Sequence, residues 1–175
     1  LELGAGDAAR AEALFARGAE LEPEHAPLVS ARASAKIRRG DVAGARALFR
    51  TSIRHSGASS LFHGWGQLEL GEGHIKRAEA LFRRGTAAGR GSVSDIAFLW
   101  HSLGAVLTRQ RRHAEALAAF QSGLALHADS SQLLLGSAVA HANLANSLAA
   151  RRSVLAAVRS DPYHAQAWRA WGDHE

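Results

Sequence analysis

Histidine is the residue type whose abundance first suggests chemistry. The chain has ten histidines among 175 residues, and imidazole is the commonest metal ligand in proteins. No His-Glu-x-x-His run or other paired carboxylate–histidine spacing occurs, however. His63 and His101 occupy equivalent places in two predicted helices, and His25 and His164 both follow proline turns. These placements follow from repetition of a structural unit, so we predict no metal site and no cofactor.

Other catalytic residue types are equally uninformative. The absence of cysteine excludes disulfides, thiolate catalysis and Cys-ligated zinc. Gly71-x-Gly73 and Gly89-x-Gly91 are not phosphate-binding loops, because no predicted strand precedes them and the Walker lysine is missing. Ser, His and Asp are plentiful, but nothing places them around one pocket. An enzyme is therefore the poorest hypothesis, and we predict neither catalytic residues nor a small-molecule substrate.

Aromatic and cationic side chains could instead bind a macromolecule. Aromatic rings stack on nucleic-acid bases, but the tryptophans occupy positions that a helical repeat uses for packing, which favours a place in the core. The tryptophans are Trp65, Trp100, Trp168 and Trp171. Paired arginines lie at helix or turn positions, where a solvated outer surface is the simpler interpretation. These arginines are Arg83, Arg84, Arg111, Arg112, Arg151 and Arg152.

Charge is unevenly distributed along the chain. The total is +5, from 21 basic and 16 acidic residues. Residues 1–25 carry −4, residues 26–128 carry +9, and residues 129–175 are balanced. The basic middle suits a polyanionic partner such as RNA, although a solvated basic surface explains it equally well. Apolar residues make up 47% of the chain, which argues against disorder, and no apolar run is long enough to insert into a membrane.

A repeat runs through the whole chain, so the helices that it encodes must position any binding residues. The motif Ala-x-Ala-Leu-Phe begins at Ala11, Ala45 and Ala78, and weaker copies begin at Ala116 and Ala150. Successive copies are 34, 33, 38 and 34 residues apart. Three residues after the large apolar side chain of each copy comes a small one, at Gly18, Ser52, Gly85, Gly123 and Ala157. This pattern predicts a helix whose small residues admit a neighbouring helix.

A second set of small residues precedes the motifs by twelve positions. It comprises Ala33, Gly66, Gly104 and Ala138, and Gly172 continues the series. Large apolar side chains often precede these positions by four places or by one, so that they fall on one face at three- and four-residue spacing, as in an amphipathic helix. Each period therefore encodes two antiparallel helices, which we name A and B in chain order. Glycines at 39–41 and 71–73 mark A-to-B turns, and Ser94 and Asp95 are candidate caps of one A helix.

These patterns predict an all-α solenoid of about ten helices without strands. A B helix is expected near 7–21, helix pairs over 26–55, 58–88, 95–127 and 130–160, and an A helix from 164. The corresponding units are half repeat 1–25, pairs 26–57, 58–94, 95–129 and 130–163, and half repeat 164–175. We interpret the 38-residue spacing as a four-residue loop insertion within 86–92. The half repeats at both ends, and a first residue that is Leu1, predict a piece of a longer solenoid.

Parts of this pattern resemble the tetratricopeptide repeat (TPR). Trp100-x-x-Leu103-Gly104 followed by Ala116-x-x-x-Phe120 is similar to it, and Ala11, Phe15 and Pro23 match its second half. Trp65-x-x-x-Glu69-x-x-x-Gly73, the similar opening at Trp171-x-x-x-Glu175, and Asp161-Pro162-Tyr163-His164-Ala165 resemble the narrower half-a-tetratricopeptide (HAT) repeat. HAT repeats of this kind occur in plant and algal chloroplast factors that stabilise and process transcripts. The resemblance implies a right-handed superhelix, and so a right-handed α-solenoid, that binds single-stranded RNA along its inner surface, in an organelle.

In TPR-like superhelices, the free face of the A helices lines the concave groove. Candidate binding residues on that face are Ser34, Arg38, His63, Gln67, His101, Arg109, Gln132, Asn143 and Arg169. Guanidinium groups suit phosphates, and amides suit base edges or peptide backbone. The leading hypothesis is a non-enzymatic scaffold for single-stranded RNA in organellar RNA processing or a ribonucleoprotein. The alternative is a protein–protein interaction scaffold in a large assembly, because the same residues suit an extended acidic peptide.

Overall fold

A computed structural model describes residue 10, residues 13–15 and 17–18, and residues 25–172. This part of the chain contains helices and no strand, which confirms the all-α prediction. The labelled helices are α2 (Ala26–Arg38), α3 (Val42–Ser56), α4 (Ser59–Gly71), α5 (Ile75–Ala88), α6 (Val93–Arg109), α7 (His113–Leu126), α8 (Ser131–Asn143), α9 (Ser147–Ser160) and α10 (Ala165–Gly172). The helix predicted near 7–21 and the stretch 173–175 lie largely outside the described residues.

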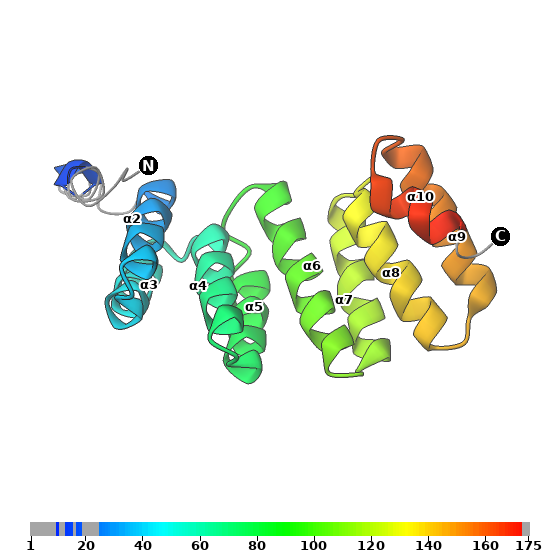
Figure 1. Cartoon of the computed structure of the whole chain (residues 1–175), viewed down its shortest axis with the longest axis horizontal. Helices are drawn as coiled ribbons and strands as arrows, with labels where there is room; N and C mark the ends of the chain where they lie inside the picture. The colour runs from blue at the N-terminus through cyan, green and yellow to red at the C-terminus, as the bar shows by residue number, and fades with distance from the viewer. Residues whose placement is uncertain (1–9, 11–12, 16, 19–24, 173–175) are drawn as a thin grey trace, which may run out of the picture.

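The helices form a row of antiparallel pairs, as Figure 1 shows. Each helix packs mainly against the helices that precede and follow it in the chain. In addition, α2 contacts α4, α4 contacts α6, and α6 contacts α8, whereas the described parts of α3, α5, α7 and α9 make at most slight contacts with one another. The row therefore curves toward its even-numbered helices. We call α2, α4, α6, α8 and α10 the inner helices, and α3, α5, α7 and α9 the outer helices.

The repeated small and large residues pack against each other inside each pair. Phe82 of α5 and Phe120 of α7 are at most 2% exposed. Their rings lie directly over Gly66 of α4 and Gly104 of α6, so that any Cβ at either glycine would overlap the ring. The large residues therefore depend on the small ones, as the repeat predicts. Phe49 and Val154 are the equivalent buried side chains in α3 and α9.

Each turn from an inner to an outer helix contains one left-handed residue. The four equivalent residues are Gly40, Gly73, Arg111 and Ala145, with φ between 58° and 79°. The predicted glycine turns at 39–41 and 71–73 are confirmed. Arg111 and Ala145 adopt the same conformation, although a side chain makes it unfavourable. The turn geometry is thus repeated even where the sequence does not provide glycine.

The predicted loop insertion within 86–92 is wrong. Helix α5 continues to Ala88, and α6 has 17 residues where α2, α4 and α8 have 13 each. The four extra residues thus form an additional first turn of α6. The cause is a capping box in which the Ser92 hydroxyl accepts from the Asp95 backbone N–H and the Asp95 carboxylate accepts from the Ser92 backbone N–H. Asp95 takes part in the cap as predicted, whereas Ser94 is not the N-cap.

The tryptophans only partly follow the predicted core placement. Trp65 and Trp100 pack against the core, but Trp168 is 51% exposed, and its indole N–H donates to the Pro162 carbonyl at 2.7 Å. The side chain of Trp171 lies outside the described residues. None of the helices in the described part of the chain combines the length and apolar character that a bilayer crossing requires.

Candidate binding groove

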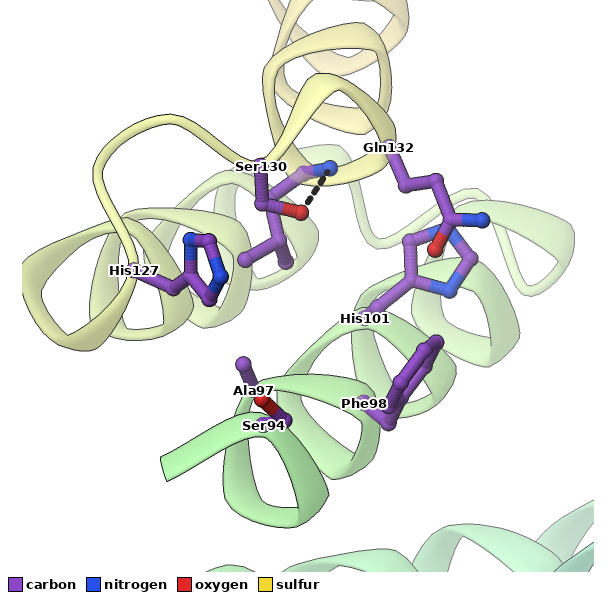
Figure 2. A pocket seen from close by; sticks show the side chains of 8 residues that line it. Ser94, Ala97, Phe98, His101, His127, Ser130 and Gln132 are labelled. Atoms are coloured by element: carbon purple, nitrogen blue, oxygen red, sulfur yellow. Dashed lines mark hydrogen bonds between the residues drawn. The ribbon is translucent and has the colours of Figure 1, made fainter. Parts of the chain in front are cut away.

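Three hollows follow one another across the inner helices. The first, of about 170 Å³, lies between α4 and α6 and is lined by Ser60, His63, Asp95 and Phe98. The second, of about 80 Å³, lies between α6 and the start of α8 and is lined by Ser94, Ala97, Phe98, His101, His127, Ser130, Gln132 and Leu133 (Figure 2). The third, of about 270 Å³, reaches α10 and is lined by His101, Gln132, Leu135, Gly136, Val139, His164 and Gln166.

Shared residues join the three hollows into one groove. Phe98 lines the first and second hollows, and His101 and Gln132 line the second and third. Figure 2 shows Phe98 and His101 projecting from α6 and Gln132 from the first turn of α8. We call the residues that line these three hollows the inner groove.

The inner groove is nearly free of fixed charge. None of its lining residues is arginine or lysine, and its one carboxylate is that of Asp95. That carboxylate already accepts hydrogen bonds from the backbone N–H and the hydroxyl of Ser92, at 3.1 and 2.8 Å. The remaining polar groups are imidazoles, amides and hydroxyls, which both donate and accept hydrogen bonds. This lining suits an uncharged polymer backbone better than a row of phosphates.

His63 and His101 are held among aromatic rings. The His63 ring lies 6.1 Å from the ring of Phe82 and 6.4 Å from that of Phe98, and the His101 ring lies 6.1 Å from that of Phe120. Burial lowers the pKa of His63, against a smaller opposing effect of Asp95. Burial also lowers the pKa of His101, and the neighbouring His63 adds to this effect. The neutral form of both imidazoles is therefore favoured at pH 7.

Apolar side chains contribute as much to the groove as polar ones. Phe98 is 50% exposed and Val139 is 49% exposed, and Leu135 lines the hollow beside Val139. These three residues were not among the sequence candidates, because only polar and charged side chains were selected from the inner-helix face. Their distances along the chain from the small residues Gly104 and Ala138 equal those of selected candidates in other repeats. They therefore occupy the same positions within the repeat. The repeat phase alone would have found them.

The nine sequence candidates lie at different places on the inner helices. His63, His101 and Gln132 line the inner groove, and Gln67 lies beside it, with its amide nitrogen 3.2 Å from His63 Nε2. Ser34, Arg38, Arg109, Asn143 and Arg169 are exposed but line none of the three hollows. The Asn143 amide donates to the Val139 carbonyl of its own helix at 2.8 Å.

Arginines line the hollows beside the outer helices instead. One such hollow contains Arg77 and Arg84 of α5, and another contains Arg152 and Arg159 of α9. The guanidinium of Arg84 lies 5.5 Å from the centre of the Phe62 ring, within the range of a cation–π contact. The basic character of residues 26–128 thus belongs largely to surfaces other than the inner groove.

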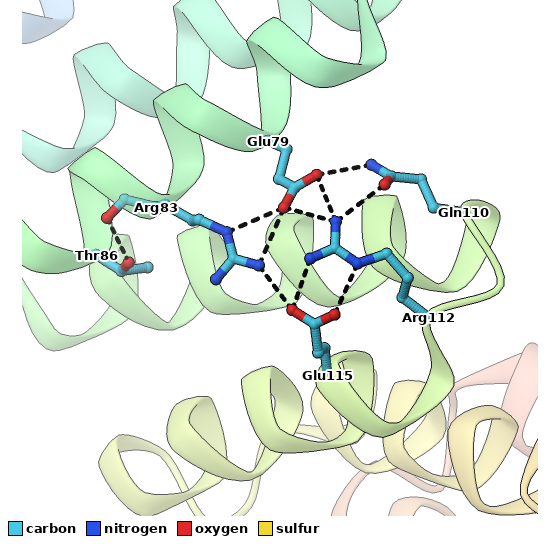
Figure 3. Close-up of polar contacts among 6 residues, drawn as sticks. All are labelled: Glu79, Arg83, Thr86, Gln110, Arg112 and Glu115. Carbon is cyan, nitrogen blue, oxygen red and sulfur yellow. Dashed lines mark hydrogen bonds and ion pairs between the residues drawn. The ribbon is translucent and has the colours of Figure 1, made fainter.

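Several arginines are also engaged in an ion-pair cluster between two helix pairs. Arg112 donates through Nη1 to both Glu79 oxygens at 2.9 Å, and through Nε and Nη2 to Glu115 at 2.7 and 2.6 Å (Figure 3). Arg83 bridges Glu79 and Glu115 at 3.0 and 3.1 Å, and Gln110 donates to Glu79 at 2.9 Å. Although burial opposes it, hydrogen bonds from Gln110, Arg83 and Arg112 lower the pKa of Glu79. We call these five residues the Glu79 cluster.

A second cluster surrounds a buried carboxylate. Glu69 is 2% exposed and accepts from Arg46 Nε at 2.7 Å, from Trp65 Nε1 at 2.9 Å and from Arg46 Nη2 at 3.1 Å. His74 Nδ1 lies 3.0 Å from the same carboxylate. Burial raises the pKa of Glu69, but the hydrogen bonds from Arg46 and Trp65 outweigh it, so the pKa is lowered overall. This Glu69 cluster joins α3 to α4 and to the start of α5.

The described residues contain no candidate metal centre. No group of three or more His, Asp or Glu in this part of the chain is arranged to hold a metal ion. The Glu69 and Glu79 clusters join helix pairs, whereas the inner groove is open.

The row of antiparallel pairs with its inner groove is a TPR-like helical-repeat fold. BtubC from P. vanneervenii has a similar structure, with a TM-score of 0.78 at 13% identity over 97% of this chain and 80% of that chain. PilF of Pseudomonas aeruginosa has a TM-score of 0.73 at 14% identity, over 97% of this chain and 82% of that chain. YrrB, a TPR protein with an unusual peptide-binding site, has a TM-score of 0.68 at 22% identity, over 91% of this chain and 81% of that chain. No protein-family model and no curated protein matches the sequence.

Proposed function

We propose that this chain is a non-enzymatic scaffold whose inner groove holds an extended segment of another protein. The observation that carries the proposal is the lining of the groove. Exposed apolar side chains, Phe98 and Val139, alternate there with amides and imidazoles over three connected hollows. An extended peptide presents the same two features, apolar side chains and a hydrogen-bonding backbone. The similarity to YrrB, a TPR protein with a peptide-binding site, supports this proposal.

The lining favours protein over RNA. Binding to a nucleic-acid backbone depends on lysines and arginines that neutralise phosphates, and the inner groove has neither. Arg83 and Arg112, which contribute to the basic middle of the sequence, are paired with carboxylates in the Glu79 cluster. RNA processing and an organellar location stay predictions of the sequence.

Site-specific photo-crosslinking tests the proposal. Gln132 in the groove and Gln121 on outer helix α7 are both exposed glutamines, so each is replaced by a photoreactive amino acid in separate variants. The chain is irradiated in an extract of its source cells. We expect an adduct at position 132 that protease removes and ribonuclease does not, and a much weaker one at position 121. Equal labelling at the two positions would contradict binding in the groove.

A titration with labelled single-stranded RNA tests the competing hypothesis of an RNA scaffold. If the exposed arginines of the inner helices bind RNA, its affinity falls by roughly 0.7 log unit per tenfold increase in salt for each phosphate contacted. We expect only weak binding that does not change when Arg38, Arg109 and Arg169 are replaced by Gln. Tight, salt-dependent binding that these substitutions abolish would replace the protein scaffold with an RNA scaffold.

A further inference from the structure

We propose that the inner groove selects protein segments that carry aliphatic or aromatic side chains and no acidic ones, and that it releases them on acidification. This inference rests on the proposed function and adds two properties to it, the chemical class of the bound segment and its control by pH.

The apolar preference follows from two anchoring points on neighbouring inner helices. Phe98 of α6 lies between the first and second hollows and leaves half of its surface exposed. Val139 of α8 is similarly exposed and lines the third hollow together with Leu135. Each anchor sits beside an imidazole or an amide, His101 or Gln132, that can bond the backbone of a bound segment. Apolar side chains on that segment would cover the exposed carbon of both anchors.

The exclusion of acidic side chains follows from charge. A carboxylate that enters the groove loses hydration, and the lining residues offer no arginine or lysine to replace it. The one fixed charge of the lining, Asp95, repels a second carboxylate. A segment with uncharged side chains meets neither penalty. The groove therefore complements a neutral segment and differs from one that clamps an acidic peptide.

Release on acidification follows from the imidazoles that line the groove. His63 faces Asp95 of α6 and the ring of Phe82 of α5. His101 faces His63, the ring of Phe120 of α7 and the amide of Gln132, and it shares the lining of the second and third hollows with His127 and His164. Burial keeps the pKa of both imidazoles below the ordinary histidine value of 6.5. An apolar segment laid over them extends that burial, so it binds the neutral forms and is opposed by the protonated ones.

The sign of the pH dependence is therefore fixed. Binding displaces protons, so affinity is constant above pH 6.5 and falls as the pH decreases below it. Each imidazole that must remain neutral reduces affinity by up to about tenfold per pH unit below its pKa in the free protein. Asp95 partly compensates a positive charge on His63, whereas no acidic side chain does so for His101. We expect His101 to account for the larger share.

Selection from a displayed library of random nine-residue peptides tests both parts. The whole chain is the bait at pH 7.5, bound peptides are recovered by denaturing the bait, and a parallel selection uses a Phe98→Ser variant whose circular dichroism confirms folding. One enriched peptide without ionisable side chains is then titrated by fluorescence anisotropy at pH 7.5, 6.5 and 5.5, against the chain and its His101→Gln variant. We expect enrichment of Leu, Ile, Val and Phe, depletion of Asp and Glu, and dependence on Phe98.

The affinity should fall between pH 7.5 and 5.5, by at most about tenfold for each imidazole that must stay neutral, and it should fall clearly less in His101→Gln. Enrichment of Asp- and Glu-rich peptides that still require Phe98 would overturn the inference and leave the proposed function intact. An affinity that is equal at all three pH values would overturn the release mechanism. Failure to enrich any peptide that depends on Phe98 would overturn both the inference and the proposed function.

Discussion

The inner groove and the two ion-pair clusters use polar residues in opposite ways. In the Glu69 and Glu79 clusters, carboxylates and guanidinium groups are paired at 2.6–3.1 Å and join consecutive helix pairs. In the inner groove, imidazoles and amides face open hollows beside exposed Phe98 and Val139. Charge is thus concentrated where the repeats are held together and is nearly absent where a ligand would lie. A positive net charge therefore does not identify the binding face of a helical-repeat protein.

The largest effect is expected from breaking the Glu69 cluster. Removing one partner of a buried ion pair leaves the other charge uncompensated, so Glu69→Ala should reduce the free energy of unfolding by about 3 kcal/mol. Denaturant unfolding measures the loss. Glu72 provides the matched control, because it is exposed and lies 3.9 Å from Arg46, so Glu72→Ala should cost less than about 1 kcal/mol. Equal losses would show that burial of Glu69 is unimportant.

A somewhat smaller loss of stability is expected from overpacking the contact beneath the groove, between α6 and α7. A leucine at position 104 would collide with the ring of Phe120, and such overpacking costs about 1–3 kcal/mol. Gly104→Leu should therefore lower the melting temperature, whereas Gly71→Leu should leave it nearly unchanged, because nothing lies within 4 Å of a Cβ at position 71. Similar melting of both variants would contradict the packing of α6 on α7.

Placing a charge in the groove should affect binding and not folding. Val139→Glu adds a carboxylate to an exposed place in the third hollow, so we expect the free energy of unfolding to change by no more than about 0.5 kcal/mol. The affinity for a groove-selected neutral peptide should fall about tenfold, or about 1.4 kcal/mol. Ala118→Glu on outer helix α7, also exposed, is the control and should not alter binding.

Acid should weaken the two regions in different pH ranges. In the folded chain the pKa values of His63 and His101 lie below 6.5, so the unfolded chain takes up protons first and stability begins to fall below pH 6.5. The pKa values of Glu69 and Glu79 lie below 4.5, so their contribution is complete above pH 4.5 and is lost below it. Denaturant unfolding between pH 7.5 and 3 measures both phases. The His63→Gln/His101→Gln double variant should remove the first phase alone.

The smallest effect concerns the turns, which belong to neither region. Arg111 and Ala145 have φ of 60° and 58° at the place where Gly40 and Gly73 stand in earlier turns. Replacing either residue by glycine relieves this unfavourable conformation, and we expect a gain of about 0.5–1 kcal/mol. Thermal unfolding of Arg111→Gly and Ala145→Gly measures it, with Ala87→Gly inside α5 as a control that should be destabilising.

The sequence predicts the fold far better than the groove. Repetition of small and large residues places the helices of 26–56, 59–88 and 131–160 within one residue of their observed ends, because each copy confirms the phase of the others. The extra turn of α6 escapes this reasoning, because it depends on one local cap at Ser92 that has no counterpart in the other copies. Spacing alone shows that four residues are inserted, and only the cap decides that they are helical.

The chemistry of the groove could be predicted only in part. The repeat phase brings His63, His101 and Gln132 to the inner groove, but Phe98 and Val139 are missed when only polar residues are considered as ligand contacts. The location of charge could not be predicted, because the pairing of Arg112 with Glu79 joins residues 33 positions apart. Which arginines are paired depends on how consecutive repeats stack, and that is a property of the three-dimensional structure.

The two exposed apolar residues of the groove, Phe98 and Val139, are distinct from the residues that stack the helices. Phe98 and Val139 can change without disturbing the contact of Gly104 with Phe120, since each set projects from a different side of its helix. Mutational drift can therefore retune what the chain recognises while its architecture stays constant. For the same reason, units such as α4–α5 and α6–α7 could be shuffled or duplicated by an engineer to assemble new reading surfaces from existing parts.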